Sequence, residues 1–125
     1  MNSYIIPTLS QKPENVILHS GANDLKFIKD SKQIAKNIIN LALKSHSETT
    51  KVIISGLTPR RDKYANKVTQ VNDVLQLECN KRNIEFINHD NIVPTYDCAA
   101  CGVYLNYKGT NKLVENILCI SNSLD

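Results

Sequence analysis

Three residues of the types used in nucleophilic catalysis, His19, Ser20 and His89, lie at the ends of apolar segments of the sequence. A serine acts as a nucleophile when a histidine within hydrogen-bond reach takes its proton. His19 and Ser20 are neighbours in a strand-like run, and adjacent side chains of a strand point to opposite faces. We therefore expect the histidines to be structural residues near strand ends, with no catalytic triad formed from these three.

A second group that could do chemistry is the C-x-x-C pair of Cys98 and Cys101. Zinc would require two more ligands, whereas Cys79 and Cys119 fall in segments with helical periodicity. A thioredoxin-like pair would open a helix directly after a strand, and this pair lies in a long aperiodic segment. We expect four free thiols in a reducing compartment, and no metal or other cofactor.

The segment "PRRDK" places Arg60, Arg61 and Lys63 just after an apolar run. A solvated loop is the expected structure, and contact with an anion or phosphate is the alternative. No aromatic platform accompanies these residues, and the net charge is only +3, so binding to nucleic acid is not expected.

The 125 residues and 42% hydrophobic composition predict one domain with a single core. No apolar run approaches the roughly 20 residues that a membrane-spanning helix needs. The segment "MNSYIIPTLSQKPEN" shows no basic region followed by an apolar one, so no secretory signal is expected. These features predict a cytoplasmic protein without a membrane segment.

Hydrophobic periodicity predicts alternating strands and helices. The expected elements are, in order, a strand over 15–20, a helix over 31–45, a strand over 51–57, a helix from a cap at Asn66 to about Arg82, a strand over 83–88 and a helix over 107–121. Asp30 and Gln33 resemble a capping box at the start of the first helix. The segment 90–106, about 17 residues long, has neither period and exceeds the usual connection length.

Each expected helix has an apolar face that should point inward. These faces are Ile34, Ile38, Leu41 and Ala42 in the first helix; Val68, Val71, Leu75 and Cys79 in the second; and Leu113, Val114, Ile117 and Ile120 in the third.

Strand–helix units repeated three times predict an α/β domain with a parallel sheet. Sites in such sheets lie at the carboxyl ends of the strands, which here read "SGAND", "GLTPRR" and "NHDN". The first expected strand comes early in the chain and would leave a sheet edge exposed, where a protein partner could bind.

Four blocks, "PENVILHSGANDL", "VIISGLTPRRDK", "VNDVLQLECNKRNIEFINHDNI" and "VYLNYKGTNKLVENI", follow one another along the chain. Together they resemble the C-terminal part of an SGNH (GDSL-type) hydrolase domain, including esterase-like members. The resemblance implies a three-layer flavodoxin-like fold, truncated to three parallel strands with flanking helices. It also implies that residues 1–125 form a partial domain that lacks the block with the nucleophilic serine.

The resemblance assigns a role to the loop after the first expected strand. Gly21, Asn23 and Asp24 match the family's G-x-N-D block. Asn23 then takes the position of the oxyanion-hole asparagine, Gly21 permits the tight turn, and Asp24 holds the loop in place. Without the resemblance, Asn23 would be read as an ordinary turn residue.

The family's D-x-x-H segment should lie just before "LNYKGT". Cys101 stands at the position of its aspartate and Tyr104 at that of its histidine. A tyrosine hydroxyl, whose pKa is near 10, is a poor base at neutral pH. We therefore expect an inactive esterase-like domain, with a small ester or sugar ester as ligand if a pocket persists. The alternatives are a partial copy of an active ester hydrolase and a non-enzymatic partner-binding module.

Overall fold

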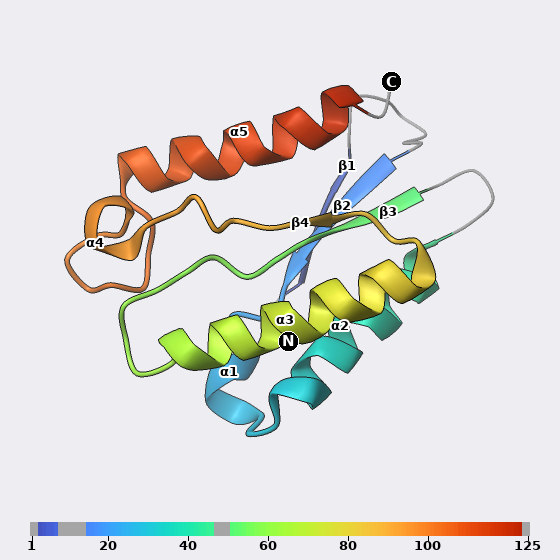
Figure 1. Cartoon of the computed structure of the whole chain (residues 1–125), viewed down its shortest axis with the longest axis horizontal. Helices are drawn as coiled ribbons and strands as arrows, with labels where there is room; N and C mark the ends of the chain where they lie inside the picture. Colours follow the sequence, from blue (N-terminus) through green and yellow to red (C-terminus); the bar gives the residue numbers. More distant parts are fainter. Residues whose placement is uncertain (1–2, 8–14, 47–50, 124–125) are drawn as a thin grey trace.

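The computed structural model describes residues 3–7, 15–46 and 51–123 as alternating strands and helices (Figure 1). The elements are β1 (Ser3–Pro7), β2 (Asn15–Ser20), α1 (Asp24–Phe27), α2 (Ser31–Ser45), β3 (Lys51–Ser55), α3 (Ala65–Arg82), β4 (Phe86–Ile87), α4 (Pro94–Asp97) and α5 (Tyr107–Ser123).

The strands form one four-stranded sheet in the order β1-β2-β3-β4. β2 and β3 are parallel, with His19 opposite Ser55, and β3 and β4 are parallel, with Ser55 opposite Ile87. These are the three parallel strands that the sequence predicts. β1 was not predicted: it pairs antiparallel with β2, with Ser3 opposite Ser20. The edge of β2 that we expected to be exposed is therefore covered by β1.

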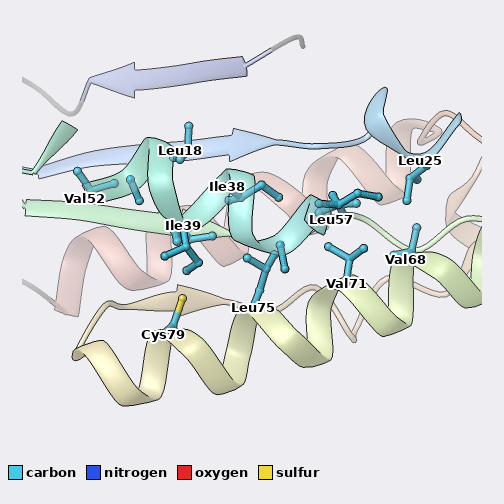
Figure 2. Close-up of a cluster of buried hydrophobic side chains, with 14 residues drawn as sticks. Leu18, Leu25, Ile38, Ile39, Val52, Leu57, Val68, Val71, Leu75 and Cys79 are labelled. Atoms are coloured by element: carbon cyan, nitrogen blue, oxygen red, sulfur yellow. The ribbon is translucent and has the colours of Figure 1, made fainter. Parts of the chain in front are cut away.

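The larger hydrophobic cluster lies between one face of the sheet and the helices α2 and α3. Figure 2 shows Val68, Val71, Leu75 and Cys79 in a row along α3, as their spacing predicts. They pack with Leu18 of β2 and with residues of β3 and α2 that are also buried, namely Val52, Ile54, Ile34, Ala35, Ile38, Ile39 and Ala42. Burial of this kind is the main favourable contribution to folding.

α5 covers the opposite face of the sheet (Figure 1). Ile17, Ile53 and Ile87 form a second buried cluster, and Ile117 and Ile120 of α5 pack against it. The sheet therefore lies between two helical layers, as a three-layer α/β fold requires. The prediction that Val114 faces inward is wrong, because its side chain is 47% exposed.

The helix starts show where local signals succeed and fail. Asp30 caps α2 as predicted, since its carboxylate accepts a 3.0 Å hydrogen bond from the amide of Lys32. The capping box does not close: among the described residues no hydrogen bond joins the Asp30 N–H to the Gln33 side chain, whose Nε2 group donates to Oδ1 of Asn37. The predicted cap at Asn66 is wrong: α3 begins at Ala65, and Asn66 lies inside the first turn.

The last predicted strand and the aperiodic segment differ from expectation in detail. β4 is only two residues long, and Asn83, the first residue of the predicted strand, instead ends α3 in the left-handed conformation (φ 55°). The segment 90–106 is ordered by the short helix α4 and by a bridge between Cys98 and Leu105. Over the described ranges, we find no helix with the length and apolar character that crossing a membrane would require.

Candidate functional site

A cavity of about 750 Å³ lies at the carboxyl ends of β2 and β3. Its walls come from the loop after β2, the loop after β3, the start of α3, the segment that leads to α5, and α5 itself. This is the position at which open α/β sheets place their ligands. The volume suits a small organic molecule.

The G-x-N-D block lies on the wall formed by the loop after β2. Gly21 has φ +108°, and a Cβ built on it would be 2.8 Å from Cδ1 of Ile38, so a side chain at this position would be both strained and crowded. Asn23 is exposed in the cavity wall and stands at the N-cap of α1 without making a side-chain capping bond. Its amide therefore remains available to a ligand.

Asp24 is buried just behind this wall. Its backbone N–H donates a 3.1 Å hydrogen bond to the carbonyl of Gly21, and its own carbonyl accepts one from Ile28. Its Oδ2 is buried with no hydrogen-bond partner among the described residues. The turn is therefore held in place by the main chain of Asp24.

Cys101 and Tyr104 line the same cavity as Gly21 and Asn23. The structure thus brings together the four residues that the resemblance with SGNH hydrolases singles out. Cys101 is exposed. Hydrogen bonds to its sulfur from the backbone N–H of Tyr104, and to a smaller extent from that of Val103, lower the pKa of its thiol. The Tyr104 side chain is exposed as well.

The loop that carries Cys101 is anchored to the loop after β3. The Arg61 guanidinium donates hydrogen bonds to the carbonyls of Ala99 (2.9 Å) and Ala100 (3.2 Å), and its backbone N–H donates to Gly102. Arg60 is only 9% exposed and forms an ion pair with Asp62. The expectation of a solvated loop is therefore wrong for Arg60.

His19, Ser55, His89 and Asn116 form a chain of hydrogen bonds beside the cavity. The Ser55 hydroxyl lies 2.9 Å from Nδ1 of His19 and 2.7 Å from Nε2 of His89, and the Asn116 amide lies 3.0 Å from Nδ1 of His89. Burial lowers the pKa of His19, and burial together with the nearby His19 lowers that of His89 to about 4. Both imidazoles are therefore neutral at pH 7.

Ser55 and Asn116 were missed by the sequence analysis. Ser55 is the register partner of His19 in the parallel pair β2–β3, so alignment of the two strand ends could have found it. Asn116 belongs to α5, and no local sequence signal connects that helix with the end of β2. Ser20 also lines the cavity, but it makes neither of the two serine–histidine contacts.

All four cysteines are free thiols, with Cys79 and Cys98 buried and Cys101 and Cys119 exposed. Among residues 3–7, 15–46 and 51–123, no three His, Cys, Asp or Glu side chains gather closely enough to hold a metal ion.

No family model matches the sequence, and no curated protein matches it. Solved structures do match the fold. Est24, a carbohydrate acetylesterase from Sinorhizobium meliloti, has a TM-score of 0.78 at 15% identity, over 93% of this chain and 63% of its own. The aryl esterase of M. smegmatis has a TM-score of 0.79 at 14% identity, over the same shares of the two chains.

A GDSL-like lipase from Bacteroides thetaiotaomicron has a TM-score of 0.77 at 17% identity, over 90% of this chain and 64% of its own. The chain thus spans less than two thirds of the length of these similar structures. Identities this low establish the architecture alone. The chain has the three-layer α/β fold of SGNH (GDSL-type) esterases and acylhydrolases, over part of their domain.

Proposed function

We propose that this chain is an SGNH esterase-like partial domain that keeps a ligand cavity and does not hydrolyse esters. The observation that carries the proposal is the presence of Cys101 and Tyr104 in the cavity wall, at the positions that the resemblance gives to the aspartate and the histidine base. An orienting acid and a base are then missing, while Asn23 still lines the cavity.

The hydrogen bonding of the histidines supports the same proposal. A nucleophile must be accessible to the substrate and within reach of a base. Among the described residues, the serine–histidine contacts are the two made by Ser55, whose side chain is 1% exposed. His19 lines the cavity, but its Nδ1 faces this buried hydroxyl.

The ligand that we would test first is a small ester or sugar ester. The cavity has room for one, and one of the similar structures is a carbohydrate acetylesterase. Such a ligand would bind with its carbonyl oxygen near Asn23 and would leave unchanged.

The experiment compares hydrolysis of p-nitrophenyl acetate by the purified chain and by Asn23→Ala. We expect both proteins to give the rate of the buffer blank. Removal of one oxyanion-hole donor from a working esterase costs about a hundredfold to a thousandfold in turnover. Turnover by the unmodified chain that drops by such a factor in Asn23→Ala would overturn the proposal.

A further inference from the structure

The chain of hydrogen bonds from α5 to the cavity has a direction. The Asn116 Nδ2 group can only donate, so Nδ1 of His89 accepts its hydrogen bond. A neutral imidazole that accepts at Nδ1 carries its proton on Nε2, and His89 therefore donates from Nε2 to the Ser55 hydroxyl oxygen.

The last member of this hydrogen-bonded chain is His19. Among the described residues, the Ser55 hydroxyl contacts two side-chain atoms, Nε2 of His89 and Nδ1 of His19. Since the hydroxyl oxygen accepts from His89, Nδ1 of His19 is the acceptor that remains for its proton. His19 must then carry its proton on Nε2. His19 is one of the residues that line the cavity, and its burial favours the neutral imidazole. A residue of the cavity wall thus carries an N–H group on Nε2, and the hydrogen bond from Asn116 of α5 sets this tautomer through His89 and Ser55.

The charges around the cavity favour an anion. Lys26, Arg60 and Lys63 line it, and Asp62 is the one carboxylate among its described lining residues. Arg60 is neutralised by its ion pair with Asp62. The ammonium groups of Lys26 and Lys63 therefore give the cavity an excess of positive charge.

Other parts of the wall are apolar, with Leu57, Val68 and Leu113 among them. A ligand suited to the cavity therefore combines an anionic head with an apolar body. Because the arginine is already occupied, the donors for the head include two ammonium groups, the Asn23 amide and one imidazole N–H. A carboxylate, with two acceptor oxygens and a single charge, matches this set.

We propose that the cavity binds a small aliphatic carboxylate, with the His19 Nε2–H as a donor to the carboxylate and Asn116 as the residue that positions that donor. This inference rests on the proposed function, because it assigns a ligand to the same cavity. It gives the ligand an anionic head in place of the neutral ester group considered above, and it adds a residue that acts from a distance.

The first test measures binding of hexanoate to the full chain by NMR titration, with hexanamide as the uncharged counterpart. We expect hexanoate to bind at least about tenfold more tightly than hexanamide, as hydrogen bonds to a charged acceptor require. His19→Phe should weaken hexanoate binding by a similar factor. His46→Phe, at the exposed end of α2, is the matched control and should not. Equal affinity for the two ligands would overturn the proposal.

The second test reverses the hydrogen-bond chain with Asn116→Asp. A carboxylate at this position only accepts, so His89 would carry its proton on Nδ1 and would accept the Ser55 proton at Nε2. The Ser55 oxygen would then accept from Nδ1 of His19, which leaves His19 with its proton on Nδ1 and a lone pair on Nε2. We expect ¹⁵N shifts of the imidazoles to show His19 protonated at Nε2 in the unmodified chain and at Nδ1 in the variant. Hexanoate binding should weaken about tenfold in the variant.

Asn111→Asp makes the same change of charge on an exposed position of α5 and is the control. Asn111→Asp should alter neither the tautomer of His19 nor the affinity for hexanoate. A proton on Nδ1 of His19 in the unmodified chain would overturn the positioning role of Asn116. Ester turnover in the assay described above would overturn the proposed function instead, so the two failures are distinguishable.

Discussion

The hydroxyl oxygen of Ser55 lies 2.7 Å from Nε2 of His89, and both side chains are 1% exposed. The contact joins the end of β3 to the segment after β4, and the same Ser55 hydroxyl contacts His19, which lines the cavity. In such a buried position a lost partner is not readily replaced by water, so each group depends on the other. The hydrogen bond between Ser55 and His89 therefore affects both the stability of the fold and the geometry of the cavity wall at His19.

Ser55→Ala should lower the free energy of unfolding by about 1–3 kcal/mol, the usual effect of leaving a buried polar group without its partner. Urea denaturation measures this change. Ser31→Ala is the control, because the Ser31 hydroxyl donates to Gln70 in an exposed contact. Its effect should stay within about 0.5 kcal/mol, as for most surface substitutions. Equal losses in the two variants would contradict the structural role of Ser55.

The stability of the chain should fall as the pH is lowered from about 6.5 to about 4. Burial and His19 lower the pKa of His89 to about 4, whereas an unfolded histidine titrates near 6.5. In this interval the unfolded chain binds a proton that the folded chain does not, so stability increases with pH by up to about 1.4 kcal/mol per unit for this group. Above pH 6.5 its contribution is constant.

Urea midpoints measured from pH 4 to pH 8 test this dependence. His89→Gln should flatten the profile between pH 4 and 6.5, leaving the smaller contribution of His19, whose pKa burial also lowers. His46→Gln, at an exposed position, should leave it unchanged. A steep profile that persists in His89→Gln would show that other groups cause the acid sensitivity.

The parallel part of the fold was predictable because its signals are local. The bounds of β2 and α2 match the predicted ranges, since the aliphatic run from Val16 to Leu18 and the Asp30 cap mark them clearly. β1 was not predicted, because a five-residue strand that ends at Pro7 is specified by its pairing with β2 rather than by its own pattern. α4 was missed for a similar reason: a four-residue helix shows no periodicity.

The site was predictable only in part. Gly21 and Asn23 are two residues apart and follow a recognisable strand. Their proximity to Cys101 and Tyr104 could be expected only from the resemblance to a known family. The burial of Arg60 could not be foreseen, because it depends on pairing with Asp62 in the folded loop. The link between Ser55 and Asn116 depends on the packing of α5 against the sheet, which no pattern within α5 specifies.

Leu75→Ala should cost about 2–5 kcal/mol of unfolding free energy, because it removes a fully buried side chain at the centre of the cluster in Figure 2. Leu77→Ala, on the same helix, is the matched control, since Leu77 is 55% exposed. We expect its effect to be below about 0.5 kcal/mol. Urea denaturation compares the two, and similar losses would contradict the placement of α3 against the sheet.

Gly109→Ala should destabilise the chain although Gly109 lies in a helix, where alanine is intrinsically better by about 1 kcal/mol. A Cβ at this position would overlap the carbonyl oxygen of Asp97. That carbonyl cannot move freely, because it accepts a 2.8 Å hydrogen bond from the amide of Asn106, while the Asp97 carboxylate binds Lys112. Crowding of this kind costs about 1–3 kcal/mol, which exceeds the gain in propensity when the backbone is held.

The melting temperature of Gly109→Ala should therefore lie below that of the unmodified chain, whereas Thr110→Ala, at the adjacent exposed position, should leave it equal or slightly raised. α4 and α5 meet at this contact, and Leu105 and Leu113, on either side of Gly109 in the sequence, both line the cavity. The NMR signals of these two leucines should therefore also shift in Gly109→Ala. A rise in melting temperature of the size that helix propensity predicts would show that the two helices are not in this close contact.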